Sequence, residues 1–291
     1  MNAYNNISTI SEVEMKKGKF RRFKEDLVGE IKKNKNVFAV YVILRFLVIA
    51  IAVMSFVNGN IENFFLCMLS LVLFLLPAFV ERKFRVNLPD ALEIIVLLFI
   101  FAAEILGEIS SFYMRVPHWD TMLHTVNGFL FAAIGFAMVD VLNRSSKIKF
   151  DLSPFYLAVT AFCFSMTVGV IWEFFEFGMD VFLKFDMQKD TVINTISSVT
   201  FDLNATNETF VFRDIADCIL VLSNGDEIRL SDYGINGYLD IGIIDTMKDL
   251  FVNFIGAVVF SVIGFFYVKS RGRGKIAKSF IPTLDDETFD L

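Results

Sequence analysis

The sequence predicts an all-α polytopic membrane protein: a bundle of six transmembrane helices with a small β-rich extracytoplasmic insertion. Three observations lead to this prediction. Apolar residues make up 55% of the chain, whereas an ordinary soluble domain has about 45–50%. These residues are concentrated in six runs that are long enough to cross the hydrocarbon core of a bilayer. Basic residues flank the runs in alternate loops, as expected of membrane helices with a fixed orientation.

The six predicted spans are apolar along most of their length, and polar loops separate them. In chain order they cover residues 37–57, 61–80, 91–113, 122–142, 155–183 and 250–268. The fifth run has a more polar end than the others, but it is long enough to span the bilayer.

The distribution of Lys and Arg gives the orientation of the spans. Basic residues are frequent before the first span, after the second, after the fourth and after the sixth, while the loop at 114–121 has only Arg115. We therefore expect both termini on the cytoplasmic side. The predicted organisation is a basic cytoplasmic segment at 1–36, five spans within 37–183, the insertion at 184–244, the sixth span within 245–268 and a cytoplasmic tail at 269–291.

The insertion at 184–244 is acidic, and its pattern changes from helical to strand-like. The stretch CILVLSNGDEIRL alternates on both sides of Asn224 and Gly225, which predicts a β-hairpin with a type I′ turn. The stretches TVINTISSVTFDL and TFVF predict further strands. The insertion is interpreted either as a lid or sensor or as a surface ornament.

Charged side chains inside the predicted spans are the main functional signal, because each costs roughly 2.5–3.5 kcal/mol on insertion scales. Four spans place such residues at one depth, in the outer third of the bilayer, and spacings of three, four or seven residues put those of each span on one helix face. The titratable residues, with two asparagines on the same faces, are Glu104 and Glu108; Asp120, His124 and Asn127; Glu173 and Glu176; and Asp245, Asp249 and Asn253. Convergence of these faces on one wet cavity avoids exposing the carboxylates to lipid.

Several ionised carboxylates in one cavity repel each other, and a divalent cation or shared protons would relieve the repulsion. An oxygen-rich ligand set with one imidazole suits Mg²⁺, Mn²⁺ or Ca²⁺ better than Zn²⁺. The candidate metal ligands are Asp120, His124, Glu173, Glu176, Asp245 and Asp249. A proton-sharing cluster and purely structural pairing stay open as alternatives.

Three stretches resemble known families: WDTMLHTVNGF, WEFFEFGMD and DTMKDLFVNFIGA, which occur in this order in the last three spans. The chain resembles an uncharacterised bacterial inner-membrane family typified by YjdF. It is more distantly similar to the VanZ-like proteins, which are linked to glycopeptide (teicoplanin) resistance. The resemblance implies a multi-pass protein of the bacterial cytoplasmic membrane, but it implies no particular reaction.

Three functional hypotheses follow. The first is a metal-assisted hydrolase or transferase that acts on an envelope lipid or lipid-linked substrate, with His124, Glu173 and Asp249 as catalytic groups. In this hypothesis Glu104, Glu108, Asn127 and Asn253 support the ligands. The second is a cation- or proton-coupled transporter, and the third is a non-catalytic membrane sensor or scaffold. The sequence has no Walker-type loop, dinucleotide fingerprint or Gly-x-Ser-x-Gly motif, and no feature indicates nucleic-acid binding.

Overall fold

The structure is a computed structural model that describes residues 35–84, 86–144, 152–270 and 278–284. Most of the predicted basic segment at 1–36 and much of the tail at 269–291 lie outside the described residues. The chain divides into two compact units. The first contains Met1–Trp119, Phe136–Leu157 and Ile263–Leu291, and the second contains Asp120–Gly135 and Ala158–Val262.

The described part of the chain contains five helices that are long and apolar enough to cross a membrane. They cover Lys35–Val57, Ile61–Lys83, Trp119–Asp140, Pro154–Leu183 and Ile243–Lys269. Large apolar side chains on these helices are exposed, for example Phe46 (70%) and Phe174 (70%). Contiguous apolar surface of this kind is typical of a membrane-facing protein.

The third predicted span, at 91–113, is not among these five helices. Here helix α5 (Asp90–Ile100) continues into the π-helix η1 (Phe101–Ile109), and the short helix α6 (Phe112–Arg115) follows. Ser111 ends the helical run in the left-handed region with φ 59°. The stretch also carries Glu93, Glu104 and Glu108. It is therefore neither one long α-helix nor poor in charged residues. Six spans therefore stay a prediction, while the described part of the chain contains five candidate spans.

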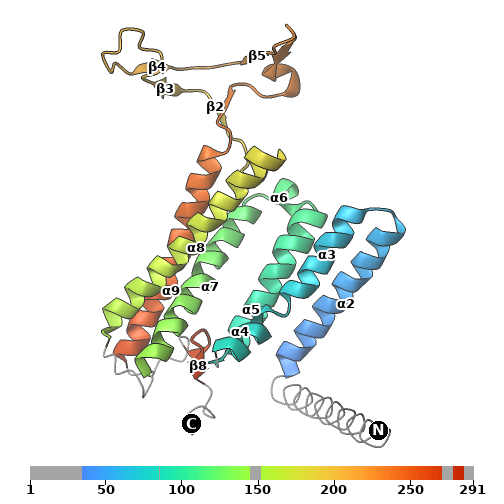
Figure 1. Cartoon of the computed structure of the whole chain (residues 1–291), viewed down its shortest axis with the longest axis vertical. Coiled ribbons are helices and arrows are strands. Elements are labelled where there is room, and N and C mark those ends of the chain that lie inside the picture. Colours follow the sequence, from blue (N-terminus) through green and yellow to red (C-terminus); the bar gives the residue numbers. More distant parts are fainter. Residues whose placement is uncertain (1–34, 85, 145–151, 271–277, 285–291) are drawn as a thin grey trace, which may run out of the picture. The chain divides into compact units, whose positions relative to one another are not determined.

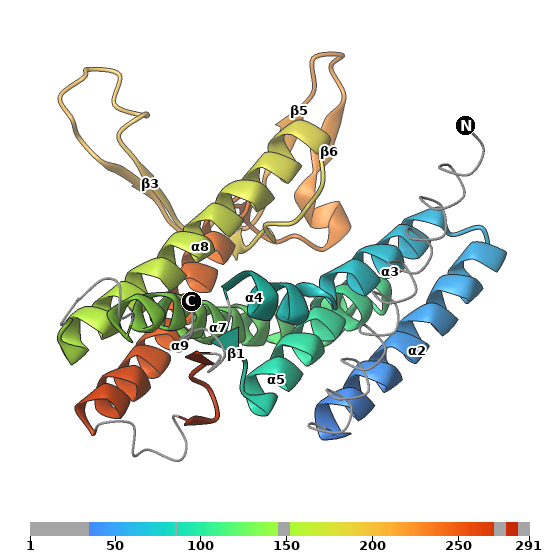
Figure 2. The ribbon, with the colours of Figure 1, turned by 60° about the horizontal axis from the view of Figure 1, so that its bottom comes forward.

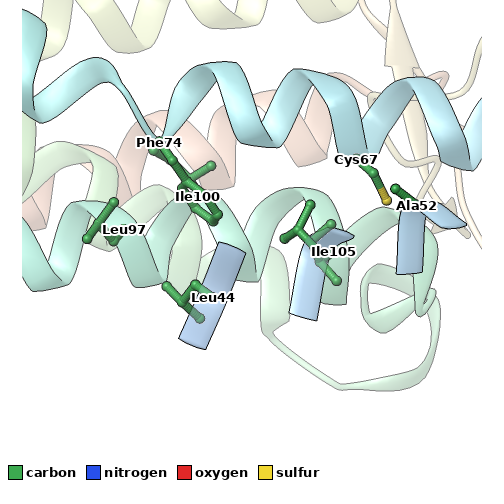
Figure 3. Packing of buried hydrophobic residues seen from close by; sticks show 8 residues of the cluster. Leu44, Ala52, Cys67, Phe74, Leu97, Ile100 and Ile105 are labelled. Atoms are coloured by element: carbon green, nitrogen blue, oxygen red, sulfur yellow. The ribbon is translucent and has the colours of Figure 1, made fainter. Parts of the chain in front are cut away.

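The first compact unit has its hydrophobic core between helix α2 (Lys35–Val57), helix α3 (Ile61–Leu73) and the α5–η1 run (Figure 3). Asn60 caps α3 by accepting a hydrogen bond from the Asn63 amide at 3.0 Å. The turn between α2 and α3 contains Gly59 with φ 72°, a conformation that glycine adopts without steric cost. The buried core residues are Leu44, Val48, Ala52, Cys67, Phe74, Leu97, Ile100 and Ile105.

Helix α3 ends one turn before Pro77, and helix α4 (Leu76–Phe84) begins there. A proline has no amide proton, and its ring clashes with the carbonyl four residues earlier, which here belongs to Leu73. The backbone continues through the interruption by a bond from the Leu75 amide to the Val72 carbonyl at 3.0 Å. In the same unit strand β1 (Val86–Asn87) pairs antiparallel with strand β8 (Thr283–Leu284).

Three long helices contribute to the second compact unit: α7 (Trp119–Arg144), α8 (Pro154–Leu183) and α9 (Ile243–Lys269). Their residues 120–135, 158–183 and 243–262 belong to this unit, and their other ends belong to the first. They run side by side (Figures 1 and 2). Edge-to-face aromatic pairs fill the contacts, with ring centroids 5.1 Å apart for Phe129–Phe260 and 5.4 Å apart for Phe162–Phe254. The Ser165 hydroxyl of α8 donates to the Gly128 carbonyl of α7 at 2.7 Å.

Two glycines allow α7 and α9 to approach backbone to backbone. A Cβ at Gly128 would lie 2.1 Å from the carbonyl oxygen of Asn253, and a Cβ at Gly256 would lie 2.1 Å from that of Thr125. Helices in membranes associate through such small residues, because apolar burial alone does not drive their contact in lipid. These two positions therefore set the distance between α7 and α9.

The segment between α8 and α9 contains small antiparallel strand pairs (Figure 1). Strand β2 (Val192–Ile193) pairs with β7 (Tyr238–Leu239), β3 (Ile196–Ser198) with β4 (Phe210–Phe212), and β5 (Ile219–Val221) with β6 (Glu227–Arg229). A 3-10 helix, η2 (Leu230–Tyr233), follows β6. The predicted strands are present, but each is only two or three residues long.

The predicted hairpin forms with a different turn. The Leu222 amide donates to the Asp226 carbonyl at 2.8 Å, so the loop has three residues, Ser223 to Gly225, instead of two. Among the described residues Gly225 has φ 92°, and Asn224 has no positive φ. A type I′ turn requires positive φ at both positions, whereas a three-residue loop needs it only at the last. The type I′ prediction is therefore wrong.

Candidate functional site

The first turns of α7 place Asp120 and His124 one above the other. The Nε2 atom of His124 lies 3.5 Å from Oδ1 of Asp120. The His124 side chain is 9% exposed, whereas that of Asp120 is 33% exposed. The spacing of four residues explains this geometry, because positions i and i+4 share a helix face.

Helices α8 and α9 bring one carboxylate each to the same imidazole. Oε1 of Glu173 lies 3.9 Å from Nδ1 of His124, and Oδ2 of Asp249 lies 3.9 Å from Nε2. Both carboxylates are buried. The two ring nitrogens of His124 thus face carboxylates from opposite sides: Glu173 on one side, Asp120 and Asp249 on the other.

Glu176, one turn after Glu173 on α8, completes the group. It is buried, and its Oε1 accepts a hydrogen bond from the indole nitrogen of Trp172 at 2.8 Å. The spacing of Trp172 and Glu176 would have predicted this bond, but the sequence analysis missed it. We call Asp120, His124, Glu173, Glu176 and Asp249 the cluster.

The cluster could hold a metal ion. Two groups, Asp120–His124–Asp249 and His124–Glu173–Glu176, each offer three ligand atoms that lie within 4.8 Å of one another. Each group combines one imidazole nitrogen with two carboxylate oxygens, and metals such as Mg²⁺ and Mn²⁺ accept carboxylate ligands. His124 belongs to both groups, so it is the central residue of the cluster.

The polar groups of the cluster are incompletely satisfied within the described part of the chain. Oε2 of Glu173 is buried and has no hydrogen-bond partner. No Lys or Arg among the described residues forms an ion pair with these carboxylates, and within that part of the chain the cationic group paired with them is His124 in its protonated form. A buried polar atom without a partner is costly, and one imidazolium would leave a net negative charge if all four carboxyl groups were ionised.

Asn127 and Asn253 make their bonds beside the cluster rather than to its carboxylates. The Asn127 amide donates to Oδ1 of Asn253 at 3.5 Å, and the Asn253 amide contacts Sδ of Met166 at 3.6 Å. A Cβ at Gly169 would lie 2.7 Å from Nδ2 of Asn253. Asn253 therefore joins all three helices of the unit.

The remaining predicted site residues lie elsewhere. Asp245 is at the start of α9, where its Oδ2 accepts the Lys189 amide at 2.7 Å, and it belongs to neither metal-sized group. Glu104 and Glu108 lie on η1 in the other compact unit, so their role stays a prediction.

Carboxylates also tie the segment between α8 and α9 to the helix ends, which the sequence analysis did not predict. Asp180 at the end of α8 accepts the amides of Met187 and Gln188 at 2.6 and 2.8 Å. Asp240 accepts the amides of Thr191 and Ile244 at 2.7 and 2.8 Å. No sequence signal distinguishes these carboxylates from other acids, because their partners are backbone amides.

The hydrogen bonds that Asp240 accepts shift its pKa. Burial by itself raises the pKa of this carboxyl, but hydrogen bonds from the amides of Thr191, Ile244 and Gly242 favour the ionised form and outweigh it. The pKa of Asp240 therefore lies below its ordinary value, and the carboxylate is ionised at neutral pH.

Comparisons with known proteins agree with a membrane protein but name no reaction. An uncharacterized protein of Thermotoga maritima is 24% identical over 127 residues, which are 44% of this chain and 64% of that protein. The chain thus covers less than two thirds of the length of this relative. No solved structure matches the chain. The family model described as "Predicted membrane protein (DUF2238)" matches residues 39–270, which is most of the chain. The chain therefore belongs to the DUF2238 family of predicted membrane proteins.

Proposed function

We propose that the protein is an envelope enzyme that holds a divalent cation in the cluster and acts on a lipid headgroup or lipid-linked substrate. One observation carries the proposal: Glu173 has a buried carboxylate oxygen without a partner among the residues that the structure describes, beside three further carboxylates and a single imidazole. A divalent cation would supply both the missing positive charge and the missing partner. The same arrangement would be unfavourable if the carboxylates stayed ionised without one.

The donor set favours a hard cation. Carboxylate oxygens outnumber the imidazole nitrogen in both metal-sized groups, and oxygen ligands suit Mg²⁺, Mn²⁺ and Ca²⁺. Typical zinc sites have more nitrogen or sulfur ligands. We propose Asp120, His124, Glu173, Glu176 and Asp249 as ligands, with Asp245 as a further ligand through its second carboxylate oxygen.

Within this proposal the residues of the cluster have distinct roles. The ligands of the cluster would hold the cation, which would supply a Lewis acid for a phosphoryl or carbonyl oxygen of the substrate. Glu173, His124 or Asp249 would take up and return the proton of the reacting group; the imidazole lies 3.9 Å from each of the two carboxylates. Asp120 has the most exposed side chain of the cluster, so substrate is expected to approach from its side.

We further propose that the α5–η1 run crosses the membrane as a sixth span. With six spans, the positive-inside pattern places both termini in the cytoplasm and the cluster in the outer third of the bacterial inner membrane. The lipid bilayer itself is then the source of the substrate. The resemblance to YjdF-type proteins and the more distant one to VanZ-like proteins stay predictions. Both would agree with a function in the bacterial cell envelope.

The test is the metal content of the purified full-length protein, compared with the Asp120→Asn/His124→Ala double variant. We expect the wild type to contain a divalent cation, or to gain thermal stability on addition of Mg²⁺, Mn²⁺ or Ca²⁺, and the double variant to do neither. A metal-free wild type that responds to none of these ions, nor to Zn²⁺, would exclude the metal site.

A second experiment separates the enzyme from the alternatives. Lipid extracts from cells that produce the wild type or Asp249→Asn are compared by mass spectrometry, and the enzyme hypothesis expects a product that only the wild type forms. Uptake of a cation or protons into liposomes, altered by Glu173→Gln, would indicate a transporter instead. A function that tolerates both substitutions but fails on deletion of residues 190–238 would indicate a sensor or scaffold.

A further inference from the structure

Helix α9 carries a groove of about 440 Å³ near its N-terminal end. The residues that line it are Ile243, Ile244, Met247, Lys248 and Phe251. Three of them are large, apolar and exposed, with Ile243 and Met247 at 59% and Phe251 at 62%. Asp249 and Asn253 lie on another face of α9 and are buried against the neighbouring helices. The groove therefore faces the surroundings of the helices, which in a membrane are lipid.

Lys248 is the charged residue among those that line the groove. Its side chain is exposed, and within the described part of the chain its ammonium forms no hydrogen bond and no ion pair. The nearby Asp245 carboxylate accepts the Lys189 amide instead. Helix α9 has 27 residues and is therefore about 10 Å longer than the hydrocarbon core of a bilayer. Centred in the membrane, it brings Lys248 to the boundary between headgroups and acyl chains, where a lysine extends its ammonium toward the headgroups.

We propose that the groove binds one anionic phospholipid, with the headgroup phosphate at Lys248 and an acyl chain along the apolar side chains. The inference deepens the proposed function and rests on it, because this lipid would be the class of substrate on which the cluster acts. Ligand sites are commonly apolar with a few polar groups that fix the orientation, and here one ammonium stands beside an apolar groove. A zwitterionic headgroup carries its own cation, which competes with Lys248 for the phosphate. A headgroup with a net negative charge therefore gains more from this site.

The apolar face of α9 continues beyond the groove, at spacings of three or four residues that keep its side chains on one face. Its exposed members are Phe251, Ile255, Val258 and Val262. Val258 lies ten residues after Lys248, which is about 15 Å along the axis and half of the hydrocarbon core. Phe251 is held beside this path, since its ring stacks on that of Phe254 with 7° between the planes. An acyl chain below Lys248 thus has apolar surface through the depth of one leaflet.

The position of Lys248 relates the groove to the cluster. It directly precedes Asp249, whose Oδ2 lies 3.9 Å from Nε2 of His124. The two residues therefore differ in depth by only about 1.5 Å. A headgroup at Lys248 would lie at the depth of the cluster, on the adjoining side of α9. Lys248 would also give an anionic substrate a positive contact at the edge of a site that is rich in carboxylates.

The experiment counts lipids bound to the full-length protein by native mass spectrometry, with phosphatidylglycerol and phosphatidylcholine of the same acyl chains as probes. We expect the wild type to bind one molecule of phosphatidylglycerol more tightly than phosphatidylcholine. Lys248→Gln should weaken phosphatidylglycerol binding about fivefold, which is the contribution of one basic residue near an anionic lipid surface. Lys248→Arg should keep the preference. Phe251→Ala should weaken binding of both lipids by the same factor, because it removes apolar surface and no charge.

Lys189→Gln is the matched control. It removes the same charge from a lysine whose ammonium already pairs with Asp186 at 3.3 Å, so lipid binding should stay as in the wild type. Equal affinity of the wild type for both lipids, or wild-type phosphatidylglycerol affinity in Lys248→Gln, would overturn the proposal, because Lys248 would then only anchor α9 at the interface. A protein dimer that Phe251→Ala separates, in place of bound lipid, would overturn it as well.

Mn²⁺ titration separates this inference from the proposed metal site. Lys248→Gln keeps every proposed ligand and loses a nearby positive charge, so it should bind Mn²⁺ at least as tightly as the wild type. A wild type that binds phosphatidylglycerol through Lys248 but binds no Mn²⁺, Mg²⁺ or Ca²⁺ would overturn the proposed enzyme and the substrate role of the lipid. The lipid site itself would then stand.

Discussion

Replacing Gly256 by alanine tests whether the close contact between α7 and α9 assembles the cluster. The added Cβ would lie 2.1 Å from the carbonyl oxygen of Thr125 and 2.8 Å from the backbone nitrogen of Phe129. Both are backbone atoms, so no change of side-chain rotamer relieves the clash. Thr125 directly follows His124, and Gly256 lies two turns after Asp249. The substitution therefore pushes apart the two helix segments that carry these ligands.

The size of the effect follows from the contact distances. Real Cβ atoms essentially never approach a heavy atom closer than 3.0 Å, so the helices must separate by about 1 Å at this point. Overpacking of this kind costs about 1–3 kcal/mol of stability. The 3.9 Å distance between His124 and Asp249 would increase as well, so we expect cation affinity to fall by at least about tenfold, as when ligand support is disturbed.

The assay combines thermal unfolding in detergent with Mn²⁺ titration, and Gly178→Ala is the control. A Cβ at Gly178 of α8 would meet only Cδ2 of Phe182, at 3.9 Å, which is an ordinary contact. This variant should be neutral or slightly more stable, since alanine favours a helix by about 1 kcal/mol over glycine. If Gly256→Ala unfolds at the same temperature and binds Mn²⁺ as tightly as Gly178→Ala, the close contact does not hold the cluster together.

Three further predictions concern the cluster and Asp240. Trp172→Phe removes the 2.8 Å bond to the buried Glu176 and should cost about 1–3 kcal/mol in thermal unfolding; an unchanged midpoint would show that Glu176 finds another donor. A chelator should lower the midpoint of the wild type but not of Asp249→Asn, because a ligand at 100 times its Kd stabilises by about 2.7 kcal/mol. Asp240 has a depressed pKa, so its stabilising bonds are complete above the ordinary aspartate value of 3.8 and are lost as pH falls through its lower folded pKa. Hydrogen exchange at the Thr191 amide should therefore stay slow down to about pH 4 and be faster at each pH in Asp240→Ala, which has no side-chain acceptor; equal protection in both would refute this.

The sequence alone predicted the elements whose physical cause is local. Long uncharged apolar runs have few solutions other than a membrane helix, and the structure has candidate spans at α2, at α3 with α4, and at α7, α8 and α9. The four-residue spacing of Asp120 and His124 placed both on one face for the same local reason. The high cost of lipid-exposed carboxylates also predicted that acids from different helices would gather, and Glu173 and Asp249 do lie beside His124.

Local sequence patterns did not predict two features of the backbone: the π-helix in the third apolar run and the loop length of the hairpin. The hydropathy of the third run did not reveal the π-helix η1, because a π-helix changes the hydrogen-bond register without changing composition. The dipeptide Asn224-Gly225 predicted a hairpin, but among the described residues only Gly225 of the two has a positive φ, as a three-residue loop requires. The backbone conformation at both places depends on contacts with other parts of the chain as well as on the local sequence.

The sequence by itself therefore determined the membrane class of the protein and the residue types of its candidate site. The tertiary structure decided which acids lie around the imidazole of His124. Asp120, Glu173, Glu176 and Asp249 do, while Asp245 accepts the Lys189 amide instead. Which acids reach His124 depends on the contact of α7 with α9 and on the path of residues 187–191 between α8 and α9. Periodicity gives the face of a residue on its own helix, but only the packing of helices against each other gives the distance to a partner.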